Sequence, residues 1–232
     1  MRPAYVKQYG LPRSGTNYLC YLLRRNYELR VLVNETGWKH GMISTPAEWR
    51  GKLLYLVTAK NPYSWLVSMH RFARKHPMMR RDVPFAEFLR EPFVFRGRAI
   101  DGDNPQTLAM RAANPVQFWN DMLFHWLEFL EVDGRGALLR YEDLLRDPET
   151  KLNGVVGAWR GRRPFEVPTR ELKPSWDEHR PGEMLGTKVF PREVYLEERW
   201  REAYTEDHLA FVDCHLDAAV MAKTGYAGIG KE

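Results

Sequence analysis

The residue types best suited to chemistry are concentrated in one turn near the amino terminus, Gly10-Leu11-Pro12-Arg13-Ser14-Gly15-Thr16-Asn17. The backbone N–H groups of such a turn and the positive end of a following helix converge on one anion. Gly10 and Gly15 have the spacing of the two glycines of a Walker A loop, but Thr16 and Asn17 stand where that loop has Lys and Ser or Thr. The turn therefore predicts a phosphate-binding loop whose positive charge comes from Arg13 instead of the Walker lysine.

A second candidate follows residues 29–33, whose alternating pattern predicts a strand. In open α/β sheets, functional groups gather just past the carboxyl ends of strands. His40 lies in such a place beside Lys39, and Glu35 precedes it. A single histidine is usually structural, but this position favours His40 as a functional residue.

The third candidate is the pair Lys60 and Ser68. The nearly continuous apolar run 52–59 is typical of a central parallel strand that is covered on both faces. Asn61 and Pro62 then suit the cap and the first position of a helix. Ser68 would lie about two turns into that helix. A hydroxyl and an ammonium near one helix N-terminus suit a phosphate group.

The remaining pattern predicts the elements that hold these residues. Residues 4–9 predict a strand before the loop, and residues 18–23 predict a helix after it. Prolines interrupt the pattern from 76 to 113. Further elements are predicted at 85–90 (helix), from 114 (helix), at 136–140 (strand), from 147 (helix), and at 192–204 and 206–223 (one helix each). Strands that alternate with helices predict an α/β fold with a central parallel β-sheet flanked by helices, in one domain spanning residues 1–232.

Composition limits the classes of partner. The 232 residues include 35 basic and 30 acidic ones, a net charge of +5 that is spread along the chain. This suits an anionic ligand and predicts no nucleic-acid partner. No apolar run is long enough for a membrane span, and the first strand leaves no room for a signal peptide, so we expect a cytoplasmic protein without a membrane partner. Cys20 and Cys214 lie in apolar helical patterns and are expected to be buried free thiols, with no metal site.

Three segments together resemble the sulfotransferases that use 3′-phosphoadenosine 5′-phosphosulfate (PAPS). Pro12–Thr16 is similar to the family's 5′-phosphosulfate loop, and Asn17 replaces its common second threonine. Lys60 and Ser68 have the spacing of the family's arginine and serine at the 3′-phosphate, with lysine in place of arginine. Lys39-His40 resembles a Lys-x-His segment whose histidine is the base, while other branches of the family use a glutamate near the position of Glu35.

The resemblance implies a P-loop nucleotide-kinase-like sulfotransferase fold. Residues 4–75 would then form the donor-binding core, 76–113 a variable region on the acceptor side, and 160–192 a basic loop over the nucleotide. In that loop, Arg180 and Gly182 are similar to an Arg-x-Gly motif that closes over the 3′-phosphate.

The implied reaction is transfer of a sulfuryl group from PAPS to a hydroxyl or amine acceptor by in-line displacement. The acceptor would be a small molecule or a glycan, the second product would be 3′,5′-adenosine bisphosphate (PAP), and no metal would take part. Residues 12–17 would bind the 5′-phosphosulfate, with Arg13 also stabilising negative charge on the leaving oxygens. His40, or Glu35 in its place, would remove the acceptor's proton.

The sequence is also compatible with two other functions. An ATP-dependent kinase of nucleotides or small molecules shares the loop pattern, but the missing Walker lysine counts against it. The other is a non-catalytic protein of the same fold that binds an anion or a polyanion through arginine pairs, namely Arg24-Arg25, Arg80-Arg81 and Arg162-Arg163. The sequence does not predict the identity of the acceptor or the oligomeric state.

Overall fold

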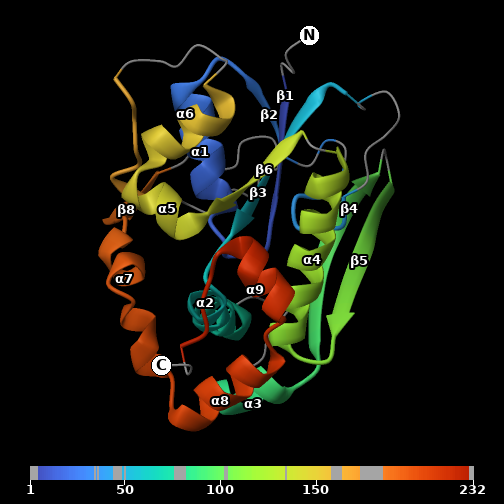
Figure 1. The fold of residues 1–232 in the computed structure, drawn as a ribbon, viewed down its shortest axis with the longest axis vertical. Coiled ribbons are helices and arrows are strands. Elements are labelled where there is room, and N and C mark those ends of the chain that lie inside the picture. Colours follow the sequence, from blue (N-terminus) through green and yellow to red (C-terminus); the bar gives the residue numbers. More distant parts are fainter. Residues whose placement is uncertain are drawn as a thin grey trace.

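The computed structural model describes residues 5–33, 35, 37–43, 49, 51–75, 82–101, 104–133, 135–157, 164–172 and 185–229. Within these ranges a parallel sheet has the strand order β2-β1-β3-β6. Its strands are β1 (Tyr5–Gly10), β2 (Arg30–Leu32), β3 (Leu53–Ala59) and β6 (Gly136–Arg140). Helices flank this sheet, which confirms the predicted α/β fold (Figure 1).

Different helices cover the two faces of the sheet (Figure 1). On one face, α1 (Thr16–Asn26), α5 (Tyr141–Arg146) and α6 (Pro148–Val156) enclose a core that includes Val6 of β1. On the other face, α4 (Pro115–Asp133) packs Trp126 against Tyr9. This alternation along β1 follows from the two-residue period of a strand, which sends successive side chains to opposite faces.

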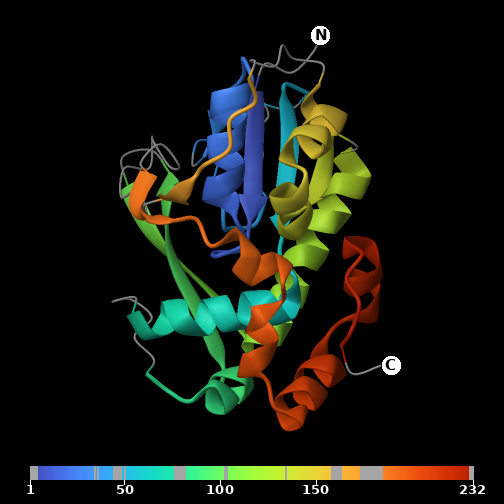
Figure 2. The same cartoon turned by 90° about the vertical axis from the view of Figure 1, so that its left-hand side faces the viewer.

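Helix α2 (Pro62–Lys75) begins just after β3 and crosses below the carboxyl ends of the strands (Figure 2). Asn61 caps it by accepting hydrogen bonds from the N–H groups of Tyr63 and Ser64, at 3.0 and 3.2 Å. Pro62 occupies the first helical position, as its fixed φ and missing N–H favour. The predicted strand, cap and helix are therefore all present where two candidate residues, Lys60 and Ser68, must be held.

Two strands lie in the region where prolines obscured the pattern. After α3 (Phe85–Arg90), β4 (Phe93–Asp101) and β5 (Asn104–Ala112) form a separate antiparallel pair, in which Ile100 lies opposite Pro105. Proline is tolerated there because each strand of a two-stranded pair has a free edge, where a missing N–H breaks no hydrogen bond.

Each predicted C-terminal helix is divided in two. The 192–204 segment forms α7 (Arg192–Leu196) and a 3₁₀ helix (Arg199–Ala203), separated where Glu198 has φ 53°. The 206–223 segment forms α8 (Glu206–His215) and α9 (Ala218–Thr224), because the chain turns extended at Leu216 and Asp217 caps a new helix. Between α6 and α7 lies the pair β7 (Arg170–Leu172) and β8 (Leu185–Val189).

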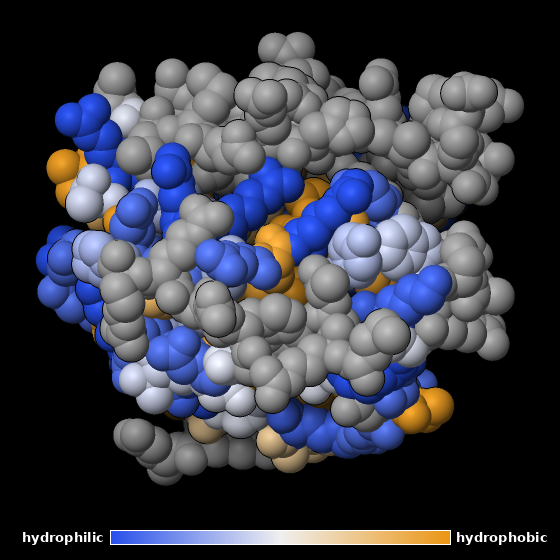
Figure 3. Space-filling model, turned by 90° about the horizontal axis from the view of Figure 1, so that it is seen from above, coloured by the Kyte–Doolittle hydropathy of each residue, from blue (hydrophilic) through white to orange (hydrophobic). Residues whose placement is uncertain are grey.

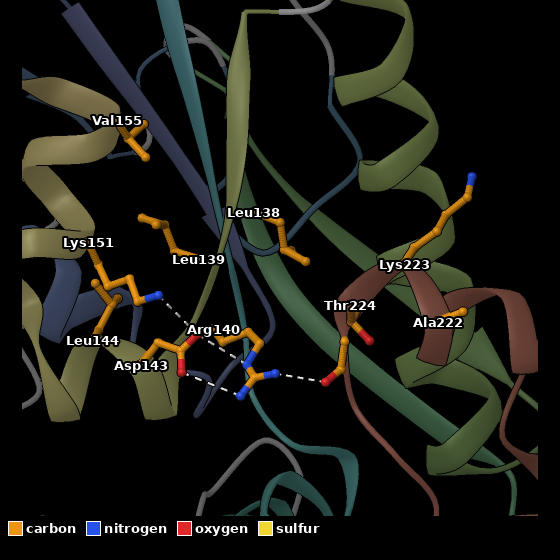
Figure 4. Close-up of a pocket in the computed structure, with 11 residues that line it drawn as sticks. Leu138, Leu139, Arg140, Asp143, Leu144, Lys151, Val155, Ala222, Lys223 and Thr224 are labelled. Carbon is orange, nitrogen blue, oxygen red and sulfur yellow. Dashed lines mark hydrogen bonds and ion pairs between the residues drawn. The ribbon is translucent and has the colours of Figure 1, made fainter.

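The C-terminal helix α9 lies beside β6, and a pocket of about 430 Å³ opens there (Figure 4). Arg140 donates to the Gly225 carbonyl at 2.7 Å and forms an ion pair with Asp143. Asp143 also pairs with Lys151, and Lys223 pairs with Glu131. Each charged side chain that lines this pocket thus already has an ion-pair partner. None of the predicted site residues lines it.

The surface gives two further findings. Cys20 is buried as expected, but Cys214 is exposed, because α8 is a surface helix with a single buried residue, Val212. At the end of the molecule where β1 begins, hydrophilic side chains border a small hydrophobic area (Figure 3). Across the described ranges, every helix is too short or too polar to cross a membrane.

Candidate active site

The loop between β1 and α1 leaves the N-terminus of α1 available to an anion. Arg13 and Gly15 both have positive φ, 66° and 91°, and Ser14 closes the turn by donating from its N–H and its hydroxyl to the Leu11 carbonyl. In the described chain, no side chain caps α1 and its first turn contains no acidic residue. The free N–H groups and the helix dipole therefore point positive charge at the space beyond Thr16.

Both glycines of this loop are required by close packing. A Cβ atom on Gly10 would lie 2.8 Å from the Thr58 carbonyl oxygen of the neighbouring strand. A Cβ atom on Gly15 would lie 2.2 Å from the ring of Tyr141. The indole N–H of Trp65 on α2 also donates to the Pro12 carbonyl at 2.7 Å. The loop is thus fixed by β3, α2 and α5 together.

A pocket of about 310 Å³ opens beside this loop. Helix α7 and the residues just before it form its other wall. Tyr18 and Phe190 are stacked with centroids 5.3 Å apart. The lining combines loop residues with aromatic side chains that the sequence did not single out: Arg13, Gly15, Thr16, Asn17, Tyr18, Tyr141, Glu171, Leu172, Phe190, Pro191 and Tyr195. It offers an electropositive end and flat aromatic faces.

Lys60 and Ser68 lie together, with the Lys60 Nζ atom 2.7 Å from the Ser68 hydroxyl. Lys60 is only 1% exposed, and its ammonium lies 4.2 Å from the centroid of the Tyr195 ring. Burial lowers the pKa of Lys60 to about 7, although the Glu142 carboxylate acts to raise it and Arg13 lowers it further. This lysine is therefore poised to gain positive charge when an anion binds next to it.

Arg71 is a residue of this site that the sequence reasoning missed. Its positive charge contributes to lowering the pKa of Lys60, as that of Arg13 does. It lies three residues after Ser68 on α2, and that spacing places it on the same side of a helix, which was the available signal. Among the described residues, no ion pair joins a carboxylate to Arg13 or to Arg71, while Glu142 acts to raise the pKa of Lys60.

The segment that carries His40 is hydrogen-bonded directly to the anion-binding loop, residues 10–17. The Lys39 carbonyl accepts from the Gly10 N–H at 3.1 Å, and the Lys39 ammonium donates to the Asn17 side chain at 2.7 Å. The His40 Nδ1 atom lies 2.5 Å from the Gly10 carbonyl oxygen. Because a carbonyl can only accept, Nδ1 carries the proton and Nε2 is left as the acceptor.

The surroundings of His40 hold its ring neutral. Trp38 and Phe95 are stacked in parallel, 5.4 Å apart, and both meet the imidazole edge-on. Burial lowers the pKa of His40 to about 3, and the charges of Lys39 and Lys7 contribute to the lowering. At neutral pH the ring is therefore neutral, with its proton on Nδ1 and its Nε2 atom an acceptor.

Glu35 is placed differently from His40. Its carboxylate accepts from the Val33 N–H at 2.8 Å and lies 3.9 Å from the Arg30 guanidinium. Burial acts to raise its pKa, but backbone hydrogen bonds and the nearby positive charges of Lys7 and Arg30 outweigh it and hold the pKa below the usual value. A carboxylate with those partners is a weak proton acceptor.

Two predicted binding residues, Arg180 and Gly182, lie outside the described residues, as do Arg80-Arg81 and Arg162-Arg163. Within the described ranges, no group of three or more His, Cys, Asp or Glu side chains is arranged to hold a metal ion.

Comparison with known proteins identifies the architecture. No protein-family model matches the chain, and no curated protein matches its sequence. Among solved structures, mouse sulfotransferase SULT7A1 in complex with PAP is similar over 98% of this chain and 90% of its own, with a TM-score of 0.52. The chain has the fold of a sulfotransferase. The two sequences are 14% identical, so the likeness extends to the fold and not to particular residues.

Proposed function

We propose that this protein is a sulfotransferase that moves a sulfuryl group from PAPS to a hydroxyl or amine acceptor. The observation that carries the proposal is the joining of two candidate segments at one point. His40 binds the Gly10 carbonyl of the anion-binding loop, and Lys39 binds Asn17 at the start of α1. A neutral proton acceptor is thereby held beside a loop built for an anion, as transfer of a charged group from a phosphate requires.

The donor would occupy the pocket beside the loop. The N–H groups of Gly15 and Thr16, with the Thr16 hydroxyl, would hold the 5′-phosphosulfate at the N-terminus of α1. Pro12 and Ser14 shape this loop through the Trp65 and Leu11 hydrogen bonds. The charge of Arg13 and the dipole of α1 then match a ligand that is anionic at its 5′ end.

The other end of the nucleotide would meet α2 and the aromatic wall. Lys60 and Ser68 would bind the 3′-phosphate, and Arg71 adds positive charge on the same helix. Phe190 is stacked on the buried ring of Tyr18 and is itself only partly buried, so its ring is the one on which a purine would stack. Arg180, with Gly182 in the proposed basic loop 160–192, would close over the 3′-phosphate.

In the reaction, the Nε2 atom of His40 would take the acceptor's proton as the acceptor oxygen bonds to sulfur. The bond between sulfur and the bridging oxygen breaks, and its electron pair leaves with the phosphate of PAP. Arg13 would stabilise the charge that collects on that oxygen. An anionic donor beside the imidazole raises its pKa from the low value of the free protein, because negative charge favours the protonated form.

The acceptor would approach from the side of β4 and β5, in the proposed acceptor region 76–113. Phe95 of β4 and Trp38 form the wall against which the His40 ring is held. A small molecule or a glycan that places a hydroxyl or amine beside Nε2 would be a substrate.

A thermal-shift titration with PAP, compared with ADP and Mg²⁺, tests the proposal. A ligand that binds only the folded state stabilises it by about 2.7 kcal/mol at a hundredfold excess over Kd. We expect PAP to raise the melting temperature, and Lys60→Met and Ser68→Ala to reduce that rise. The matched control is Lys75→Met, at an exposed lysine at the end of the same helix. Stabilisation by ADP alone would favour a kinase, and no response to either ligand would favour a non-catalytic protein.

A further inference from the structure

A lysine is buried in the middle of the sheet, in the strand that leads to the anion-binding loop. Lys7 of β1 has no exposed surface. Its ammonium donates to three carbonyl oxygens, those of Val33 at 2.8 Å, Glu35 at 2.9 Å and Gly37 at 2.5 Å. All three donors of the ammonium are thus used, and all three acceptors belong to the segment that follows β2.

Packing alone does not call for a charge at this position. A central strand covered on both faces normally carries apolar residues, and a buried charge is costly unless it is fully paired. Burial lowers the pKa of Lys7 to about 7, while Glu35 acts to raise it and Lys39 to lower it. Burying the Lys7 ammonium therefore costs folding free energy, which its hydrogen bonds to the segment after β2 must offset.

Those contacts bend that segment around the ammonium. Carbonyls at alternate positions point to one centre only if the backbone curls, and Gly37 supports the curl with φ 112°, a conformation that glycine adopts without strain. Lys39 and His40 follow within three residues. On the far side, α4 holds the chain through hydrogen bonds from Trp126 to the Gly41 carbonyl and from the Ile43 N–H to His125.

We propose that Lys7 is a positioning residue, which holds the backbone at Val33, Glu35 and Gly37 so that His40 lies against the Gly10 carbonyl of the anion-binding loop. Its role in the reaction rests on the proposed function, but its hold on the segment does not. Lys7 does not touch the reacting atoms itself. It acts through the backbone, because without it three carbonyls would be left with no donor beneath the segment.

The first test compares Lys7→Met with Lys52→Met, which removes an exposed lysine just before β3. In hydrogen–deuterium exchange of the full chain, we expect Lys7→Met to speed exchange in 37–43 by roughly tenfold or more and to leave α1 and α4 unchanged, since exchange reports local opening. The control variant should match the unmodified protein throughout. Unchanged exchange in 37–43 would overturn the proposal.

The second test separates positioning from folding. Lys7→Met should lower kcat by roughly 100-fold, since a small misplacement of a catalytic group has an effect of that order, and should leave the KM for PAPS and the thermal shift with PAP unchanged. Gly37→Ala provides a second variant, because it disfavours the same curl without removing a core side chain. It should cause the same local exchange and the same selective loss of kcat.

The two proposals fail in different ways. If PAP does not stabilise the unmodified protein and no transfer occurs, the proposed function fails, and the exchange experiment alone decides whether Lys7 holds the segment. If transfer occurs and Lys7→Met keeps the full kcat, the proposed function stands and the positioning role of Lys7 is wrong. A parallel loss of PAP binding and kcat would also contradict it.

Discussion

At the scale of single residues, the two candidate bases differ in what their proton-accepting atoms contact. The Nδ1 atom of His40 is committed to the Gly10 carbonyl, which leaves Nε2 as an acceptor beside the loop. The Glu35 carboxylate is instead occupied by the Val33 N–H and lies near Arg30. Nearby donors and positive charge stabilise a carboxylate in its ionised form and weaken it as a base. Burial and positive charge weaken His40 as a base in the free protein too, so the preference for His40 rests on its position against the loop and stays a prediction.

Substitution distinguishes the two. We expect His40→Leu to lower the rate of PAP release from PAPS by roughly 100-fold to 10,000-fold, the usual contribution of a general base, with the thermal shift by PAP retained. Glu35→Gln should change the rate much less. The rates are measured over a panel of hydroxyl and amine acceptors. Full activity of His40→Leu together with an inactive Glu35→Gln would assign the base to Glu35.

At the scale of elements, the site depends on how closely the loop between β1 and α1 packs against its neighbours. The Tyr141 ring of α5 leaves no space for a side chain at Gly15, and the φ of 91° at Gly15 also disfavours one. The loop is thus packed closely against α5 and bonded to α2. Such packing holds the N–H groups in place for an anion before it binds.

Gly15→Ala tests this packing against a glycine in a different setting. The added methyl group would collide with Tyr141 and strain the backbone, so we expect a loss of roughly 1–3 kcal/mol in the free energy of unfolding and weaker binding of PAP. Gly154→Ala in α6 is the control, because no atom lies within 4 Å of the added Cβ. Alanine favours a helix interior, so this variant should gain roughly 0.5–1 kcal/mol.

Urea unfolding measures both changes. Similar stabilities for the two variants would show that the position of Gly15 against Tyr141 is not a constraint on the fold. Equal affinity for PAP in Gly15→Ala and the unmodified protein would separate the loop from nucleotide binding.

At the scale of the whole molecule, burying charged and titratable groups at the carboxyl edge of the sheet links folding to pH. His40 is held neutral with a pKa of about 3, well below the ordinary value of 6.5. In the unfolded chain the same imidazole takes up a proton as the pH falls through 6.5. Between these two values the unfolded state binds more protons, so stability declines as the pH is lowered.

The melting temperature should therefore fall between pH 6.5 and pH 3, and His40→Leu should fall less steeply over that window. Circular dichroism melts at several pH values give both curves. Parallel curves for the two proteins would show that the buried imidazole does not contribute to acid unfolding. In the free protein the His40 ring stays neutral at pH 5, so we also expect that its protonation does not limit kcat/KM there, since that quantity reports the free enzyme.

The sequence by itself determined the features that depend on neighbours along the chain. Asn61 and Pro62 start α2, the turn at 10–17 joins β1 to α1, and alternating strands and helices predict the α/β fold. These signals are local, because capping, glycine conformations and residue period act within a few positions. The structure brings the Lys60 ammonium and the Ser68 hydroxyl together near the start of α2, and their binding of a phosphate stays a prediction.

Only the tertiary structure decided which distant segments meet. The hydrogen bonds from Lys7 to the segment after β2, the wall of Trp38 and Phe95 beside His40, and the Tyr195 ring over Lys60 each join residues far apart in sequence. No local pattern encodes such contacts, since they arise when parallel strands bring their carboxyl ends to one edge of a sheet. The breaks within the C-terminal helices lie between elements that pack against α2 and α4.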